Sequence, residues 1–100
     1  MSTKKLACLI MGQNYDPKKH QAAFQTVWGT TYVFTVNNYE EAKAKVLSMI
    51  DEGFGAVELC GAFGEAKAAE IMELAQGRIA VGHVIYAGDQ SELLRRLLED

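Results

Sequence analysis

A continuous apolar run near the amino terminus is the feature that most constrains the fold of this chain. Residues 6–11 are all apolar, and Gly12 closes the run. A strand with one face in water alternates apolar and polar residues, whereas a strand covered on both faces is apolar throughout. The run therefore predicts a central strand of a sheet whose two faces are both covered.

Strand and helix patterns alternate along the rest of the chain. Residues 31–36 alternate in the way that is typical of a half-exposed edge strand. Asp16-Pro17 supplies a helix cap and a first-turn proline, and Asn38 with Glu41 forms a capping pair. The predicted helices span residues 17–26, 39–53, 65–76 and a stretch after Asp89, and the predicted strands span residues 6–11, 31–36, 56–60 and 79–86.

This order predicts an α/β fold that forms one domain over residues 1–100. A chain of 100 residues that is 49% hydrophobic and 23% charged has the composition of one soluble domain. Strands joined by helices usually lie parallel, which favours a small open, mainly parallel four-stranded sheet in the flavodoxin-like order 2-1-3-4. The alternative is a ferredoxin-like α+β sandwich, because the first helix is short and residues 31–36 could pair antiparallel.

Charge and cysteine usage exclude several classes of function. A net charge of -3 with scattered Lys and Arg residues argues against nucleic-acid binding, and no apolar segment is long enough to span a membrane. Cys8 and Cys60 lie in apolar runs, as free thiols of a reduced, cytoplasmic protein do. Two His and two Cys residues without ligand spacing predict no metal site, and the absence of a Walker loop or a dinucleotide fingerprint predicts no cofactor.

The predicted sheet places a candidate ligand site at two loops. Ligands of open parallel sheets bind at the carboxyl ends of strands where the winding reverses, here between strands 6–11 and 56–60. Glycines permit close backbone approach, and the helix that starts near Glu65 would aim free N–H groups at a small molecule, of which an anion fits best. A tight turn between a strand and a helix would need the same glycines. The candidate ligand-binding residues are Gly12, Asn14, Gly61, Ala62, Phe63 and Gly64.

Three residues are candidates for catalysis, and the sequence leaves enzymatic activity open. Glu58 interrupts an apolar strand, which predicts a buried carboxyl group with a hydrogen-bonding partner. Alternation along the strand predicts that Cys60 shares its face, so that the pair could do acid–base or nucleophilic work. Aligning the strands by their preceding glycines sets Glu58 opposite Gly82 and puts His83 on the other face, although a slip of one residue reverses this. The structural alternatives are a hydrogen-bonded carboxyl group and a structural histidine.

A long segment of the chain resembles a known family. The stretch "YEEAKAKVLSMIDEGFGAVELCGAFG" followed by "VGHVIY" is similar to an uncharacterised family of small prokaryotic proteins, known as a domain of unknown function. The similarity spans residues 6–86, and its most specific part is Glu58-Leu59-Cys60-Gly61 with Phe63-Gly64. The resemblance implies a shared fold and supplies no activity.

These observations favour a domain that binds a small molecule at the two loops. The alternative is a homo-oligomeric interaction or structural module without catalytic activity. It is favoured by a leucine stripe on the final helix and by Tyr32 and Phe34 on a predicted edge strand. A homodimer through the final helix or through strand 31–36 is therefore expected. The stripe comprises Leu93, Leu94, Leu97 and Leu98.

Overall fold

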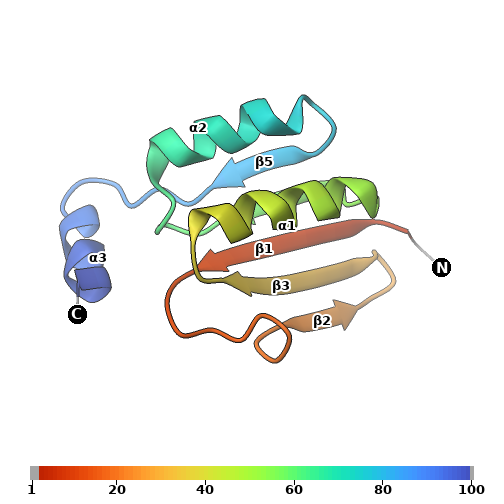
Figure 1. The fold of residues 1–100 in the computed structure, drawn as a ribbon, viewed down its shortest axis with the longest axis horizontal. Helices are drawn as coiled ribbons and strands as arrows, with labels where there is room; N and C mark the ends of the chain where they lie inside the picture. The colour runs from red at the N-terminus through yellow and green to blue at the C-terminus, as the bar shows by residue number, and fades with distance from the viewer. Residues whose placement is uncertain (1–2, 100) are drawn as a thin grey trace.

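The computed structural model describes residues 3–99 and has five strands and three helices (Figure 1). The α/β class predicted from the sequence is confirmed. The elements in chain order are β1 (Lys5–Met11), β2 (Ala22–Gln25), β3 (Thr30–Val36), α1 (Tyr39–Asp51), β4 (Ala56–Leu59), α2 (Gly64–Ala75), β5 (Ala80–His83) and α3 (Gln90–Glu99).

The strands form one mixed sheet in the order β2-β3-β1-β4-β5. β1 pairs in parallel with both β3 and β4, and β4 pairs in parallel with β5. The central position of β1 and the mainly parallel sheet agree with the prediction. The predicted strand number and order are wrong, because a fifth strand, β2, pairs antiparallel with β3. The ferredoxin-like alternative required β3 to be antiparallel, whereas β3 is parallel to β1.

The strand β2 lies where a helix was predicted over residues 17–26. Asp16 does start a helical turn, since its carbonyl oxygen accepts hydrogen bonds from the backbone N–H groups of Lys19 and His20. The turn ends there, because the Thr35 hydroxyl donates to the carbonyl oxygen of His20 at 2.7 Å and draws the chain to the sheet. Tertiary pairing thus overrides the capping signal. β2 takes the edge position, so the prediction that residues 31–36 form an edge was also wrong.

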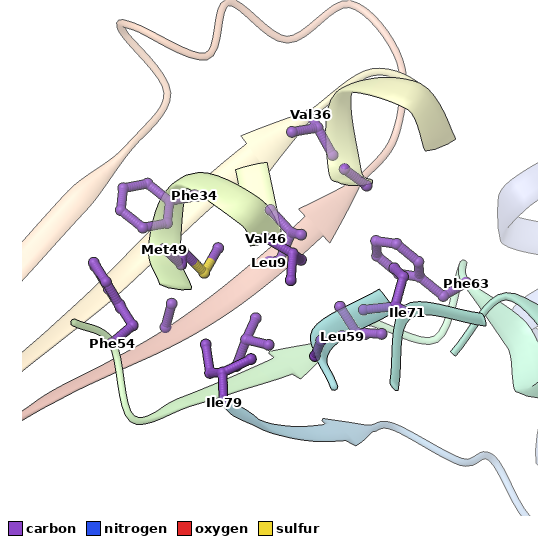
Figure 2. Close-up of a cluster of buried hydrophobic side chains, with 14 of the residues drawn as sticks. Leu9, Phe34, Val36, Val46, Met49, Phe54, Leu59, Phe63, Ile71 and Ile79 are labelled. Atoms are coloured by element: carbon purple, nitrogen blue, oxygen red, sulfur yellow. The ribbon is translucent and has the colours of Figure 1, made fainter. Parts of the chain in front are cut away.

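Both α1 and α2 cover the same face of the sheet (Figure 1). The chain passes from β3 over β1 to β4 and then on to β5, always in the same direction. Right-handed crossovers in one direction place their helices on one face. The side chains between helices and sheet form one core, part of which is shown in Figure 2. Its largest fully buried members are Leu9, Met49, Leu59, Ile71, Val46 and Val57.

The opposite face of the sheet carries none of the described helices. In β1, Ala7 and Leu9 are fully buried under the helices, so Leu6, Cys8 and Ile10 point to the other side. The expectation that both faces of the central strand are covered therefore fails within residues 3–99. We call this surface the open face, and the strand registers assign to it Leu6, Cys8, Ile10, Ala22, Phe24, Thr31, Val33, Thr35, Ala56, Glu58, Ala80 and Gly82. Thr35 is the buried member of this set, at 7% exposure.

The final helix α3 lies beyond the carboxyl ends of the strands and does not cover the sheet (Figure 1). None of its described residues is buried, and Leu97 is 71% exposed. Its leucine stripe is present as predicted. The stripe does not pack on the sheet of its own chain.

Replacing a fully buried core side chain should destabilise the fold strongly. Leu59→Ala should lower the free energy of unfolding by about 2–5 kcal/mol, because β4 lies between β1 and β5 and the cavity cannot collapse easily. Leu47→Ala on the outer side of α1, where the side chain is 40% exposed, is the matched control and should cost less than about 1 kcal/mol. Urea unfolding curves measure both values, and equal costs would contradict the assignment of the core.

Candidate functional site

A cleft of about 620 Å³ lies at the carboxyl ends of the central strands. It is located where the winding order predicts a ligand site, because β3 and β4 flank β1 and their following loops diverge. Its wall is formed by residues of all three helices, of the end of β1 and of three loops. We call it the carboxyl-edge cleft, and its lining residues are Met11, Gly12, Gln13, Asn14, Asn37, Asn38, Tyr39, Ala62, Lys67, Leu97 and Leu98.

The loop after β1 is held rigidly against the loop after β3. The Asn37 side chain accepts a hydrogen bond from the N–H group of Tyr15 at 2.8 Å and donates one to its carbonyl oxygen at 2.9 Å. The Gly12 N–H group donates to the carbonyl oxygen of Val36 at 3.0 Å. Asn14 has a φ of 64°, in the left-handed region that asparagine tolerates better than most residues. These bonds fix the polar side of the cleft before any ligand binds.

The amino end of α1 also borders the cleft. The Asn38 side chain accepts a hydrogen bond from the N–H group of Glu41 at 2.8 Å, and the Glu41 carboxylate accepts one from the N–H group of Asn37. The predicted capping pair is thus present, with Asn38 in the capping position, but Glu41 bonds the N–H group of the residue before the cap rather than that of the cap itself, as it would in a full capping box. Because these groups are satisfied within the chain, they are not available to bind a ligand in the cleft.

Tyr39 joins the two helices at the floor of the cleft. Its hydroxyl group donates a hydrogen bond to the Glu70 carboxylate at 2.9 Å. Partial burial and the hydrogen bond to Glu70 raise the pKa of Tyr39 to about 12. The phenol therefore stays protonated across the physiological pH range and acts as a hydrogen-bonding group rather than as a base.

The lining of the cleft combines amide groups, apolar side chains and one cation. Lys67 is the only charged residue among its described lining residues, and its amino group lies 5.8 Å from the centre of the Tyr39 ring. The large apolar lining residues are Leu97 and Leu98 of α3 and Met11 at the end of β1. The arrangement suits a small molecule with an apolar part and an anionic group.

The structure divides the predicted ligand-binding residues between two hollows. Gly12, Asn14 and Ala62 line the carboxyl-edge cleft. Gly61 and Gly64 line a neighbouring hollow of about 340 Å³, together with His83, Tyr86 and Leu94. Phe63 lies in the core with 3% of its surface exposed.

Four lining residues of the cleft were not among the candidates predicted from the sequence: Asn37, Asn38, Tyr39 and Lys67. Two consecutive asparagines directly after the strand 31–36 were a usable signal, since this strand also ends at the point where the winding reverses. Lys67 gave no such signal, because it lies within the first turn of a helix pattern, where a lysine is usually exposed to solvent, and only the packing of α2 brings it to the cleft.

The candidate catalytic residues Glu58, Cys60 and His83 do not gather at one place. Glu58 is exposed on the open face, so the prediction of a buried carboxyl group was wrong. It lies opposite Gly82, as predicted, and His83 lies opposite Leu59 on the helix side. Cys60 follows the end of β4 and packs against the core, where its sulfur accepts a hydrogen bond from the Met11 N–H group at 3.3 Å.

The thiol that Glu58 contacts is Cys8, its register partner across β1 and β4. The Cys8 sulfur lies 3.9 Å from the Glu58 carboxylate. Burial raises the pKa of the Cys8 thiol above its ordinary value, and the charge of Glu58 and the hydrogen bond to it raise this pKa further. The thiol is therefore protonated at neutral pH and is a weak nucleophile.

Two further features bear on the kind of protein. Among residues 3–99, no group of three or more His, Cys, Asp or Glu side chains is placed to hold a metal ion. None of the helices in this range is long and apolar enough to cross a membrane.

The fold and the cleft define an α/β protein with its helices on one face and a candidate binding site at the carboxyl edge of its sheet. The chain belongs to a family of unknown function (DUF6506), whose model matches residues 4–99. The family resemblance seen in the sequence is thereby confirmed. No curated protein and no solved structure matched the chain.

Gly64 begins α2 with a φ of +76°, as the glycine-containing turn requires. Gly64→Ala should therefore lower the free energy of unfolding by about 1–2 kcal/mol, because a Cβ disfavours the left-handed region. Gly55→Ala is the control, since this glycine has an ordinary φ and its added Cβ would meet only the Lys5 carbonyl oxygen, at 3.7 Å. Thermal or urea unfolding should show a small effect for Gly55→Ala, and an equal loss in both variants would contradict the backbone argument.

Removing the charge of Glu58 should make Cys8 more reactive. Glu58→Gln should lower the pKa of the Cys8 thiol and raise its alkylation rate at pH 8 by up to about fivefold, because a charge about 4 Å away is worth about 1 kcal/mol in water-like surroundings. Mass spectrometry of dilute protein treated with iodoacetamide gives the rate at each cysteine. Glu40→Gln at the start of α1 should change nothing at Cys8, and an unchanged rate in Glu58→Gln would show that the carboxylate does not act on the thiol.

Proposed function

We propose that this protein binds a small amphipathic molecule with an anionic group in the carboxyl-edge cleft. The observation that carries the proposal is the composition of the cleft wall. The lining combines the amide side chains of Gln13, Asn14 and Asn37 with leucines of α3, and Lys67 is the charged residue among the described lining residues. A largely apolar concave site with a few converging polar groups is the usual form of a small-molecule site.

The volume of the cleft and its rigid polar side support binding rather than a surface irregularity. About 620 Å³ lies in the range of small-molecule sites. The double hydrogen bond between Asn37 and Tyr15 holds the loop after β1 in place, so that little ordering cost remains for binding.

The ligand's anionic group is proposed to contact Lys67, and its apolar part to contact Leu97 and Leu98. Lys67 lies beside the Tyr39 ring, whose other neighbour is Lys43 at 4.7 Å from the ring centre. Lys43 forms an ion pair with Glu40 at 2.9 Å and does not line the cleft. The two lysines thus offer a matched pair for a test.

A thermal-shift screen with small carboxylates and phosphates that carry an apolar group tests the proposal. A ligand at about 100 times its Kd should raise Tm by roughly 10–20 °C. Lys67→Ala should weaken its binding about tenfold or more, because a charge-assisted hydrogen bond is lost, whereas Lys43→Ala should change the Kd less than about twofold.

Two results would contradict the proposal. One is the absence of any specific ligand in such a screen. The other is a ligand whose binding is indifferent to Lys67→Ala and shifts the NMR signals of Gly61, His83 and Tyr86 instead, since these residues line the neighbouring hollow.

A further inference from the structure

The open face has the composition of a covered surface although none of the described helices covers it (Figure 1). The side chains that β1 presents there are those of Leu6, Cys8 and Ile10, and the neighbouring strand adds Val33. A sheet face that remains in water carries alternating polar residues, whereas continuous apolar strands belong to sheets covered on both faces. The sequence of β1 and the one-sided position of the helices therefore imply a missing layer.

We propose that the open face is the interface of a homodimer in which the sheets of two copies pack face to face. At about 3.3 Å per residue and about 4.8 Å between strands, the five strands cover roughly 400 Å² in projection. Accessible area exceeds projected area, because side chains stand out from the sheet. Two facing copies would bury about 1,000 Å² in total, which is the lower limit for a specific interface and fits a dimer that dissociates on dilution. A second copy supplies the same apolar composition on a surface of the same size.

Charge fixes how the two sheets face each other. Among the described residues that the registers assign to the open face, Glu58 is the only charged one. The Cys8 thiol beside it carries no charge, so enclosing the carboxylate without an opposite charge would be unfavourable. Lys4 directly precedes β1 and is in phase with Leu6 and Cys8, which assigns its Cβ to the same side, and its amino group lies 5.9 Å from the centre of the Trp28 ring, within the chain. The proposed pairing with Glu58 of the other copy is a contact in addition to those that Lys4 makes in its own chain. Lys4 lies two residues before Leu6, and Glu58 is level with Cys8, two residues beyond it. A two-fold axis that lies between the two sheets, perpendicular to the strands and level with Leu6, therefore brings Lys4 of each copy close to Glu58 of the other.

This interface differs from the surfaces that the sequence analysis expected. Tyr32 does not lie on a free edge, because its ring packs on the core side at 5.4 Å from Phe34 and 4.9 Å from Phe54. The same strand contributes Thr31 and Val33 to the open face instead. The leucine stripe of α3 takes no part in the proposed contact.

Sedimentation equilibrium over a wide range of protein concentrations tests the proposal. The chain should form a species of twice its mass of 11.0 kDa. Val33→Glu should weaken the dimer at least about tenfold, because it places a charge in the apolar part of the interface. Leu47→Glu on the outer side of α1 is the matched control and should leave the dimer intact. Circular dichroism and Tm confirm that the variants fold.

Exchanging the charges of Lys4 and Glu58 tests how the two sheets are oriented in the dimer. This test remains valid even if the Val33→Glu variant does not fold. Lys4→Glu and Glu58→Lys should each weaken the dimer about fivefold, and the double variant should restore it to within about twofold. The two residues cannot pair within one chain, because four residues of β1 separate their levels by about 13 Å. Alkylation of Cys8 should also slow as the protein concentration rises.

Three outcomes would overturn the proposal. The first is a monomer at every concentration, whether the open face then binds α3 of the same chain or a different protein. The second is a dimer that survives both Val33→Glu and Glu58→Lys. The third is a dimer that is lost in Leu97→Glu on α3 but kept in Val33→Glu.

Discussion

Hydrogen bonding of β1 on both of its edges is the constraint on which the rest of the structure depends. β3 pairs with the whole of β1, and β4 pairs with four of its residues, in each case in parallel. Parallel neighbours on both sides require the chain to cross from β3 to β4 over the central strand, and α1 makes this crossing. The core, the one-sided helical layer and the divergence of loops at the carboxyl edge all follow from this crossing.

The same connection explains why the polar residues of the cleft converge. The loops after β1 and β3 leave the sheet side by side, so the Asn37 side chain can hydrogen bond to both backbone groups of Tyr15. The hydrogen bond between Tyr39 and Glu70 then joins α1 to α2 next to these loops. Three segments far apart in the sequence are thus fixed relative to one another by neutral and charge-assisted hydrogen bonds at the edge of the core.

Local sequence patterns predicted the helices and strands correctly where the pattern strongly favoured one type of secondary structure. The capping pair Asn38 and Glu41 and the apolar run of β1 gave α1 and the central strand correctly. The segment after Asp16 was assigned wrongly because its capping signal is real but lasts for one turn, and the pairing with β3 that decides its state is not a local property. In a flavodoxin-like fold, a helix over residues 17–26 would have covered the open face of the sheet. The wrong assignment of this one segment therefore led to the expectation of a helical layer on both faces.

The sequence predicted the position of the candidate site better than it predicted which residues line it. The position of the cleft follows from strand order, which β-strand periodicity and connection rules can supply. Which side chains line the cleft depends on the rotation of α2 about its axis, which brings Lys67 to it. The predicted pair of Glu58 and Cys60 is not formed, because the strand ends at Leu59 and Cys60 no longer follows its alternation. A change of one residue in a strand end is enough to alter such an assignment.

The distance in sequence between the partners of β1 has a consequence for how the chain folds during its synthesis. β1 is complete at Met11, but the last residue of β4 that pairs with it is Leu59. At translation rates of about 5–20 residues per second, the first strand waits roughly 2–10 s for its second neighbour. Throughout that interval its apolar side chains and one row of its backbone hydrogen-bonding groups lack their native partners. A nascent chain of this protein is therefore most exposed to misassociation early, at the strand that later becomes the most enclosed part of the sheet.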